Sequence, residues 1–167
     1  MELKKINMGN GKSKLGIDNA RICFKNFSGE NDPFGQGLGF SVIIPDEQTR
    51  DMLINDVNDL GAGWNVKLRA PREEGDTPFM HLPVKIRISE GRPAVYVRTG
   101  NKTVQMRPQD IGRLDKMNIA SVDLDISPND GDFHGRPFRS AYLDAIWVYT
   151  ATSRLEARFA EEEYPEE

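Results

Sequence analysis

The stretch LPVKIRIS, residues 82–89, alternates apolar and cationic side chains. Successive side chains of a β-strand point to opposite faces, so Val84, Ile86 and Ile88 fall on one side and Lys85 and Arg87 on the other. The pattern predicts a half-buried strand with an apolar inner side and a cationic outer side. A solvated strand face is ordinary, whereas a cationic one indicates an anionic partner.

Further stretches predict a mainly β fold around this strand. Strands are expected at residues 20–27, 40–44, 63–71, 94–100, 102–107, 121–127 and 141–152. Helices are expected at residues 46–61, after an Asp46 cap, at residues 108–117, and at residues 153–163 near the end. Seven or eight antiparallel strands with two or three short helices predict an OB-like barrel, and a β-sandwich fits the spacing nearly as well.

The two ends of the chain differ from its middle. Residues 1–18 contain three glycines and four lysines without a sustained period, which predicts a flexible basic arm. Residues 19–158 are expected to form one domain, since 167 residues with 38% hydrophobic composition suffice for one core. The last twelve residues carry a net charge of −5, so the rest carries +1 although the whole chain carries −4. Residues 159–167 are therefore expected to be a solvated acidic tail.

Cysteine and histidine usage excludes two classes of small protein. Cys23 is the single cysteine, so the chain has no intramolecular disulfide, and its two histidines are too few for a zinc cluster. This usage indicates a reducing compartment. No apolar run approaches the roughly 20 residues that span a bilayer, and the amino terminus lacks the apolar core of a signal peptide. We expect a cytoplasmic protein without cofactor, metal or membrane partner.

An enzymatic site is not apparent in the sequence. His81 and His134 are far apart and lack a metal-binding pattern, and Asp123 and Asp125 fall on the solvated face of a strand. The glycine runs GQGLG and GNGK match neither the P-loop nor the dinucleotide fingerprint. We therefore predict no enzymatic activity; a metal-dependent nuclease using the two aspartates is the least favoured alternative.

The middle strands together predict a binding face. With apolar residues inward, the strand at 63–71 directs Asn65, Lys67 and Arg69 outward, and Tyr96 and Arg98 follow on the strand at 94–100. Cations can track phosphates while aromatic rings stack on bases, which suits single-stranded nucleic acid. The alternative is that these cations serve solubility alone. The predicted DNA-binding residues are Lys67, Arg69, Lys85, Arg87, Tyr96, Arg98 and Phe34.

The aromatic residues leave several choices open. Tyr96 fits either a stacking platform or partial burial, and Phe34, in a glycine-rich loop without a strand to pack under, fits a clamp on a ligand. Trp64 shares the phase of the apolar residues around it and is expected to point inward. Trp147 lies on one face of the last strand and Ile146 on the other, and either face could be the core.

Several segments resemble a family of small single-stranded-DNA-binding proteins from tailed bacteriophages. They are ARICFKNFSG, GWNVKLRAPREEGD with LPVKI, DIGRLDKMNIASVDLDISP and AYLDAIWV, of which GWNVK and NIASVDLDISP are the most telling. The resemblance covers about residues 20–160. It implies an OB-like fold and a non-enzymatic role in DNA replication or recombination.

The expected partner is single-stranded DNA, in the cytoplasm of a bacterial host. The acidic tail is expected to compete with DNA for the cationic face or to dock on replication or recombination proteins. Homo-oligomers are left open. The alternative function is a protein-interaction module, such as an inhibitor of a host factor whose acidic surface mimics DNA, which the small size and the net charge of −4 favour.

Overall fold

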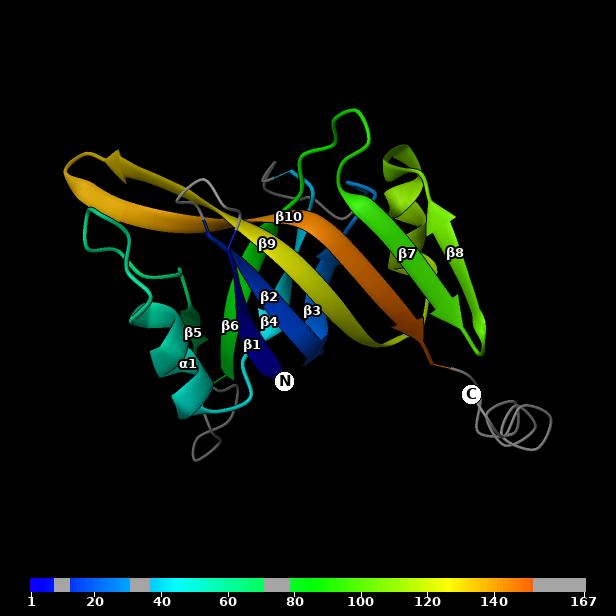
Figure 1. Cartoon of the computed structure of the whole chain (residues 1–167), viewed down its shortest axis with the longest axis horizontal. Coiled ribbons are helices and arrows are strands. Elements are labelled where there is room, and N and C mark those ends of the chain that lie inside the picture. The colour runs from blue at the N-terminus through cyan, green and yellow to red at the C-terminus, as the bar shows by residue number, and fades with distance from the viewer. Residues whose placement is uncertain (8–12, 31–36, 71–78, 152–167) are drawn as a thin grey trace.

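The computed structural model describes residues 1–7, 13–30, 37–70 and 79–151. Within these residues the protein is mainly β, as predicted, and its strands form one curved sheet (Figure 1). Two helices accompany the sheet, α1 (Glu47–Ile54) and the 3₁₀ helix η1 (Pro108–Lys116). The strands are β1 (Glu2–Asn7), β2 (Ser13–Ala20), β3 (Ile22–Asn26), β4 (Gly39–Ile43), β5 (Lys67–Arg69), β6 (Phe79–Lys85), β7 (Ala94–Thr99), β8 (Lys102–Met106), β9 (Ile119–Phe133) and β10 (Arg136–Thr150).

The long hairpin of β9 and β10 organises the sheet. The main path runs β1-β2-β9-β10-β6-β4-β3, with β5 on β6, β7 on β10 and β8 on β7. β10 pairs antiparallel with β9 on one edge. On its other edge it pairs in parallel first with β6, at Ala141 and Tyr142, and then with β7, from Ala145 to Tyr149. β6 and β7 therefore follow one another along a single edge of β10.

The sheet is open within the described residues. β1 and β3 end the main path, and they are not hydrogen-bonded to each other. The closed barrel expected from the strand spacing is therefore not seen in this part of the chain. No helix of the described residues is long and apolar enough to cross a membrane.

The expectation that residues 1–18 lack regular structure is wrong for the described part of that segment. β1 pairs antiparallel with β2, and β2 pairs with β9. Leu15 and Ile17 alternate on β2 and are buried in the core, so the hairpin is held by apolar packing as well as by backbone hydrogen bonds. Its lysines stay at the surface, and Lys4 lies 2.7 Å from Asp18.

Several predicted boundaries were also wrong. The strand expected at 63–71 is reduced to the three residues of β5. The strand expected at 82–89 starts earlier and ends at Lys85, and Ile88, expected on its inner side, is 40% exposed. The helix begins after the Asp46 cap, as predicted, but ends at Ile54, so Val57 and Leu60 are exposed beyond it. Residues 128–139, where the sequence predicted a loop between two strands, mostly extend β9 and β10, because antiparallel pairing satisfies their backbone groups.

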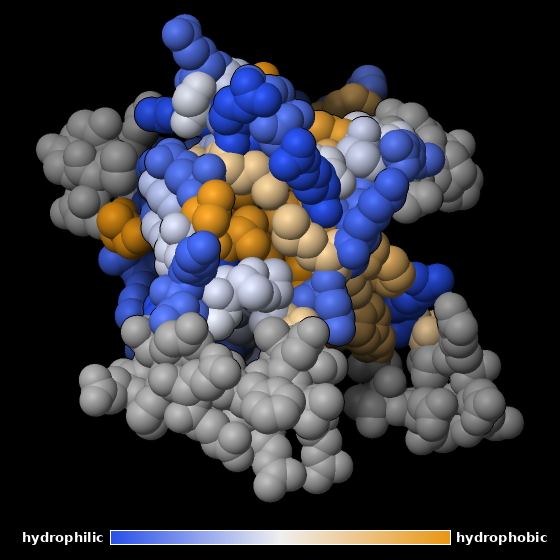
Figure 2. Space-filling view, turned by 90° about the vertical axis from the view of Figure 1, so that its right-hand side faces the viewer, coloured by the Kyte–Doolittle hydropathy of each residue, from blue (hydrophilic) through white to orange (hydrophobic). Residues whose placement is uncertain are grey.

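The core lies on the inner side of the sheet. Trp64 is buried, as predicted, and η1 contributes Ile111 and Leu114. On β10 the buried residues are Ile146 and Val148, which settles the choice left open by the sequence. Trp147 and Tyr149 therefore lie on the outer face. The end of the molecule that carries β7 and β8 shows apolar residues bordered by hydrophilic ones (Figure 2).

Candidate nucleic-acid interface

Three of the four cations predicted from the first two middle strands line one groove: Lys67, Arg69 and Lys85. Lys67 and Arg69 of β5 lie in register with His81 and Phe79 of β6. Leu82 and Val84 are buried, so the alternate side chains of β6 face outward together with those of β5. This β5–β6 groove has a volume of about 760 Å³. Its lining includes Asn65, Lys67, Arg69, His81, Lys85, Phe24, Ser41 and Pro83.

An aromatic cluster that the sequence analysis did not assign lies beside these cations. The ring of Phe24 on β3 is 50% exposed, and it meets His81 and Phe79 edge to face at centroid distances of 5.3 and 6.1 Å. The guanidinium carbon of Arg69 lies 5.1 Å from the centre of the Phe24 ring. Phe24 has a φ of 51°, within a register shift of the β3–β4 pair, and this local break redirects its side chain. Alternation alone could not have found it.

The remaining predicted residues continue the same outer face along β10. Tyr96 of β7 is stacked on Trp147 of β10, with ring centroids 5.5 Å apart and an angle of 12° between the planes. Arg98 lies in register with Tyr149 on the same two strands. The three middle strands are thus not consecutive neighbours as supposed: β5 pairs with β6, but β7 is reached through β10.

Tyr142 connects the two halves of this face. It lies in register with Lys85 across the β10–β6 pair, and the guanidinium carbon of Arg87 is 5.1 Å from the centre of its ring. Tyr142 and Trp147 were not predicted to take part. We call the outer surface formed by these residues the cationic face: Lys67, Arg69, Lys85, Arg87, Tyr96, Arg98, Tyr142 and Trp147.

Four cations of the cationic face form no ion pair with any other described residue. They are Lys67, Arg69, Lys85 and Arg87. Several basic residues elsewhere are paired with aspartates: the distances are 3.0 Å for Lys14–Asp144, 2.9 Å for Arg107–Asp110 and 2.9 Å for Arg139–Asp130. Four exposed cations without internal ion pairs are available to an external anion.

The electrostatic effect of these cations is visible at His81. Partial burial and the charges of Lys67 and Arg69 lower the pKa of the His81 imidazole below its ordinary value. Its Nδ1 lies 2.9 Å from the Ser41 hydroxyl. On the neighbouring strand, burial raises the pKa of the Cys23 thiol to about 11, so this thiol stays neutral at physiological pH.

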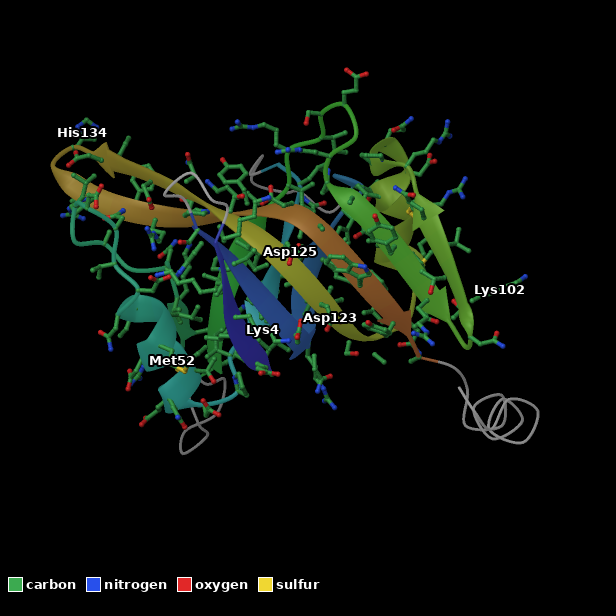
Figure 3. All side chains as sticks on the ribbon, in the orientation of Figure 1. Lys4, Met52, Lys102, Asp123, Asp125 and His134 are labelled. Atoms are coloured by element: carbon green, nitrogen blue, oxygen red, sulfur yellow. The ribbon has the colours of Figure 1, made fainter. Side chains whose placement is uncertain are left out.

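The aspartates considered for metal chemistry have structural partners. Asp123 accepts hydrogen bonds from the Tyr149 hydroxyl, at 2.9 Å, and from the Asn19 backbone, at 2.8 Å. Burial raises the pKa of Asp125, opposed by Lys14. Figure 3 shows both aspartates on β9. No group of three or more metal-ligating side chains occurs in the part of the chain that the structure describes.

A second hollow, of about 920 Å³, lies between the β1–β2 hairpin, α1 and the β9–β10 hairpin. Its charges are mixed, because Lys5 lies 3.2 Å from Asp56 and Arg139 binds Asp130 in the same region. Such internally compensated charge suits a polyanion poorly. Phe34, the predicted helix at 153–163 and the acidic tail lie outside the described residues.

Fold and surface define a mainly β protein whose open sheet carries exposed cations and aromatic rings on one outer face. The chain belongs to the family described as "Putative phage ssDNA-binding domain", whose profile matches residues 7–167. That description names a binding function rather than a catalytic one. None of the curated proteins compared with the chain matches it.

Solved structures with a similar fold include the single-stranded DNA-binding protein from bacteriophage Enc34. In the structure of its complex with ssDNA, the protein chain is 12% identical in sequence to this chain and superposes with a TM-score of 0.51. The alignment covers 91% of this chain and 97% of that one. The same protein in another structure has equal identity and TM-score, with 92% of each chain covered. A C-terminal truncation of it is 11% identical with a TM-score of 0.51, and the alignment covers 91% of this chain and 95% of that one. At this identity the likeness shows the fold.

Proposed function

We propose that the chain binds single-stranded DNA through the cationic face, without strong sequence preference. The observation that carries the proposal is the combination of four cations lacking internal ion pairs with aromatic rings on the same outer surface. Phosphates and the π-faces of bases are common to every nucleotide, so a surface that uses both tolerates any sequence. Membership of the family and the ssDNA complex of the Enc34 protein support the same partner.

The biological setting is part of the proposal. A role in phage DNA replication or recombination, in the cytoplasm of the bacterial host, suits a phage family described by ssDNA binding. The OB-like character of the fold is proposed on the same footing, supported by a curved, mainly antiparallel sheet that presents its binding residues on one face. Docking of the acidic tail on replication or recombination proteins also belongs to this proposal.

Titration with a labelled oligo-dT and with duplex DNA, at low and moderate salt, tests the proposed function. We expect oligo-dT to bind more tightly than duplex, because stacking needs unpaired bases, and its affinity to fall as salt rises. Preference for duplex, or affinity that ignores salt, would contradict the proposal. Absence of DNA binding together with a stoichiometric protein captured from nuclease-treated host lysate would favour the alternative of a protein-interaction module.

A further inference from the structure

His81 is a titratable residue inside the β5–β6 groove. Its ring lines the groove, stacks on Phe79 at a centroid distance of 5.6 Å and meets Phe24 edge to face. Only Nδ1 has a hydrogen-bond partner within the described residues, the Ser41 hydroxyl, so Nε2 is left to meet a ligand in the groove.

The described groups that face His81 from the adjacent strands are neutral or cationic. β5 contributes Lys67 and Arg69, and β6 contributes Lys85 further along its outer side. The Cys23 thiol of β3, which feels the charge of Arg69, stays protonated. β4 contributes Ser41, whose hydroxyl carries no charge. The imidazole is therefore held neutral by burial and by two nearby positive charges, with no carboxylate among the causes of its shifted pKa.

We propose that His81 takes up a proton when single-stranded DNA enters the β5–β6 groove and then binds the DNA backbone as a third cation beside Lys67 and Arg69. The inference rests on the proposed function and adds a binding residue and a pH dependence to it. The proton comes from the solvent and bonds to the ring nitrogen that carries none in the neutral imidazole, and no other covalent bond changes.

A phosphate beside Lys67 and Arg69 reverses the field at His81. Its negative charge offsets the two cations that disfavour the imidazolium, and opposite charge within about 4–6 Å favours the charged form of a titratable group. The groove does not need to rearrange for this change. The Ser41 hydroxyl can donate to Nδ1 in the neutral ring and accept from Nδ1–H in the imidazolium, so the bond to Ser41 survives protonation.

The sign of the pH dependence follows from proton linkage. In the free protein the pKa of His81 is depressed, and in the complex it is higher, so the complex holds more protons over the interval between the two values. Affinity for DNA therefore rises as pH falls through the pKa of the complex, and it levels off below the pKa of the free protein. Above both values the neutral ring contributes no charge.

The composition of the chain allows a clean experiment, because it contains two histidines only. His134 lies at the tip of the β9–β10 hairpin (Figure 3) and is exposed, so it serves as the matched control. Its φ of 53° is tolerated by asparagine, and His134→Asn therefore removes the second imidazole without added strain. His81→Gln removes the titrating ring and keeps a polar side chain in the groove.

Proton uptake on binding oligo-dT is measured at pH 6.5 by calorimetry in two buffers of different ionisation enthalpy, with affinities from pH 8 to 5.5. Thymine bases do not titrate in this range, so any uptake belongs to the protein. We expect the parent and His134→Asn to take up protons and to bind oligo-dT about threefold or more tightly at pH 5.5 than at pH 8. Each unit by which DNA raises the pKa of His81 corresponds to about a tenfold gain in affinity. His81→Gln should bind with neither effect.

Three other outcomes would overturn the inference. Tight binding without proton uptake by the parent refutes it and leaves the proposed function intact. Uptake that persists in His81→Gln, or that disappears in His134→Asn, assigns the proton to another group. Absence of oligo-dT binding at every pH refutes the proposed function and this inference together.

Discussion

Removing Lys85 and Arg87 together tests the cationic face at its centre. Both side chains are exposed, and both border Tyr142, since Lys85 is its register partner and Arg87 lies over its ring. Lys85→Ala with Arg87→Ala should weaken binding to single-stranded DNA while the sheet stays folded. The main loss of stability is the cation–π contact of Arg87 with Tyr142, about 0.5–1 kcal/mol at an exposed site.

The size of the binding defect follows from counterion release. For single strands the slope of log affinity against log salt changes by about 0.7 for each phosphate contact. If each side chain neutralises one phosphate, the double variant should lose about 1.4 from the slope. Over one decade of salt, from about 1 M down to about 0.1 M, that difference amounts to roughly 25-fold weaker binding at the lower salt.

The assay is fluorescence anisotropy of labelled oligo-dT at four or more salt concentrations, with thermal unfolding of each variant measured in parallel. A matched control is Lys5→Ala with Arg50→Ala, which removes the same charge from residues that already pair with Asp56 and Asp51. We expect the control to keep at least most of the parent's salt slope. Its melting temperature should change little, because exposed ion pairs contribute about 0–1 kcal/mol.

Three results would refute this reasoning. Equal loss of affinity in the control would mean that net charge, and not the cationic face, determines binding. A double variant with the parent's slope would mean that neither Lys85 nor Arg87 contacts phosphate. A fall in melting temperature well beyond about 2–4 °C, the shift that 1 kcal/mol causes in a protein of this size, would mean that the side chains belong to the fold.

Three further predictions concern stacking, acid stability and the tail. Tyr96→Ala should weaken oligo-dT binding by about 1–3 kcal/mol with the salt slope unchanged, and Phe34→Ala should do the same if its ring stacks on a base. Unchanged affinity with a lower melting temperature would mean that the ring packs in the fold instead. Burial would raise the pKa of Asp115, but hydrogen bonds from Ser28 and Phe27 hold this pKa below its usual value. The Asp115 carboxylate should therefore stabilise the fold above about pH 4, and this stabilisation should be lost as pH falls through the pKa of the folded state. Melting curves should therefore show Asp115→Asn less stable at neutral pH, with the difference shrinking in acid. Truncation after Arg158 should strengthen oligo-dT binding at low salt, a gain that fades as salt rises; equal affinity at every salt concentration would exclude competition by the tail.

Alternation of side chains carried most of what the sequence could predict. It assigned the outward direction of Lys85 and Arg87 and the burial of Val84 and Ile86, because the two faces of a strand differ in solvent exposure. It also separated Trp147 from Ile146, although it could not say which of them was buried. Which face is buried depends on the strands that pair with β10, and the alternation of side chains does not reveal those strands.

Topology and local breaks lay beyond the sequence. β6 and β7 share one edge of β10 through parallel pairing, and no short-range signal predicts such a long-range contact. Phe24 reaches the groove through a positive φ inside a strand, which is uncommon for a residue other than glycine and violates alternation. In β2 a signal was present, since Leu15 and Ile17 alternate, but the glycines and lysines around them favoured a flexible segment.

If single-stranded DNA binds the cationic face as proposed, the placement of acidic residues limits where the strand can run on a chain of net charge −4. Asp123 lies in register with Trp147, and Asp125 with Ala145, so the carboxylates of β9 border the cationic face on the β9 edge of β10. Lys85 of β6 and Arg98 of β7 border β10 on the opposite edge, where the two strands follow one another. The β9 edge carries carboxylates where the opposite edge carries cations, so a polyanion is attracted more strongly to the side of β6 and β7, although Lys14 opposes the charge of Asp125. The proposed function therefore predicts that a bound strand follows the line from the β5–β6 groove past Tyr142 to the Tyr96 and Trp147 pair, with β10 as the boundary of the binding path.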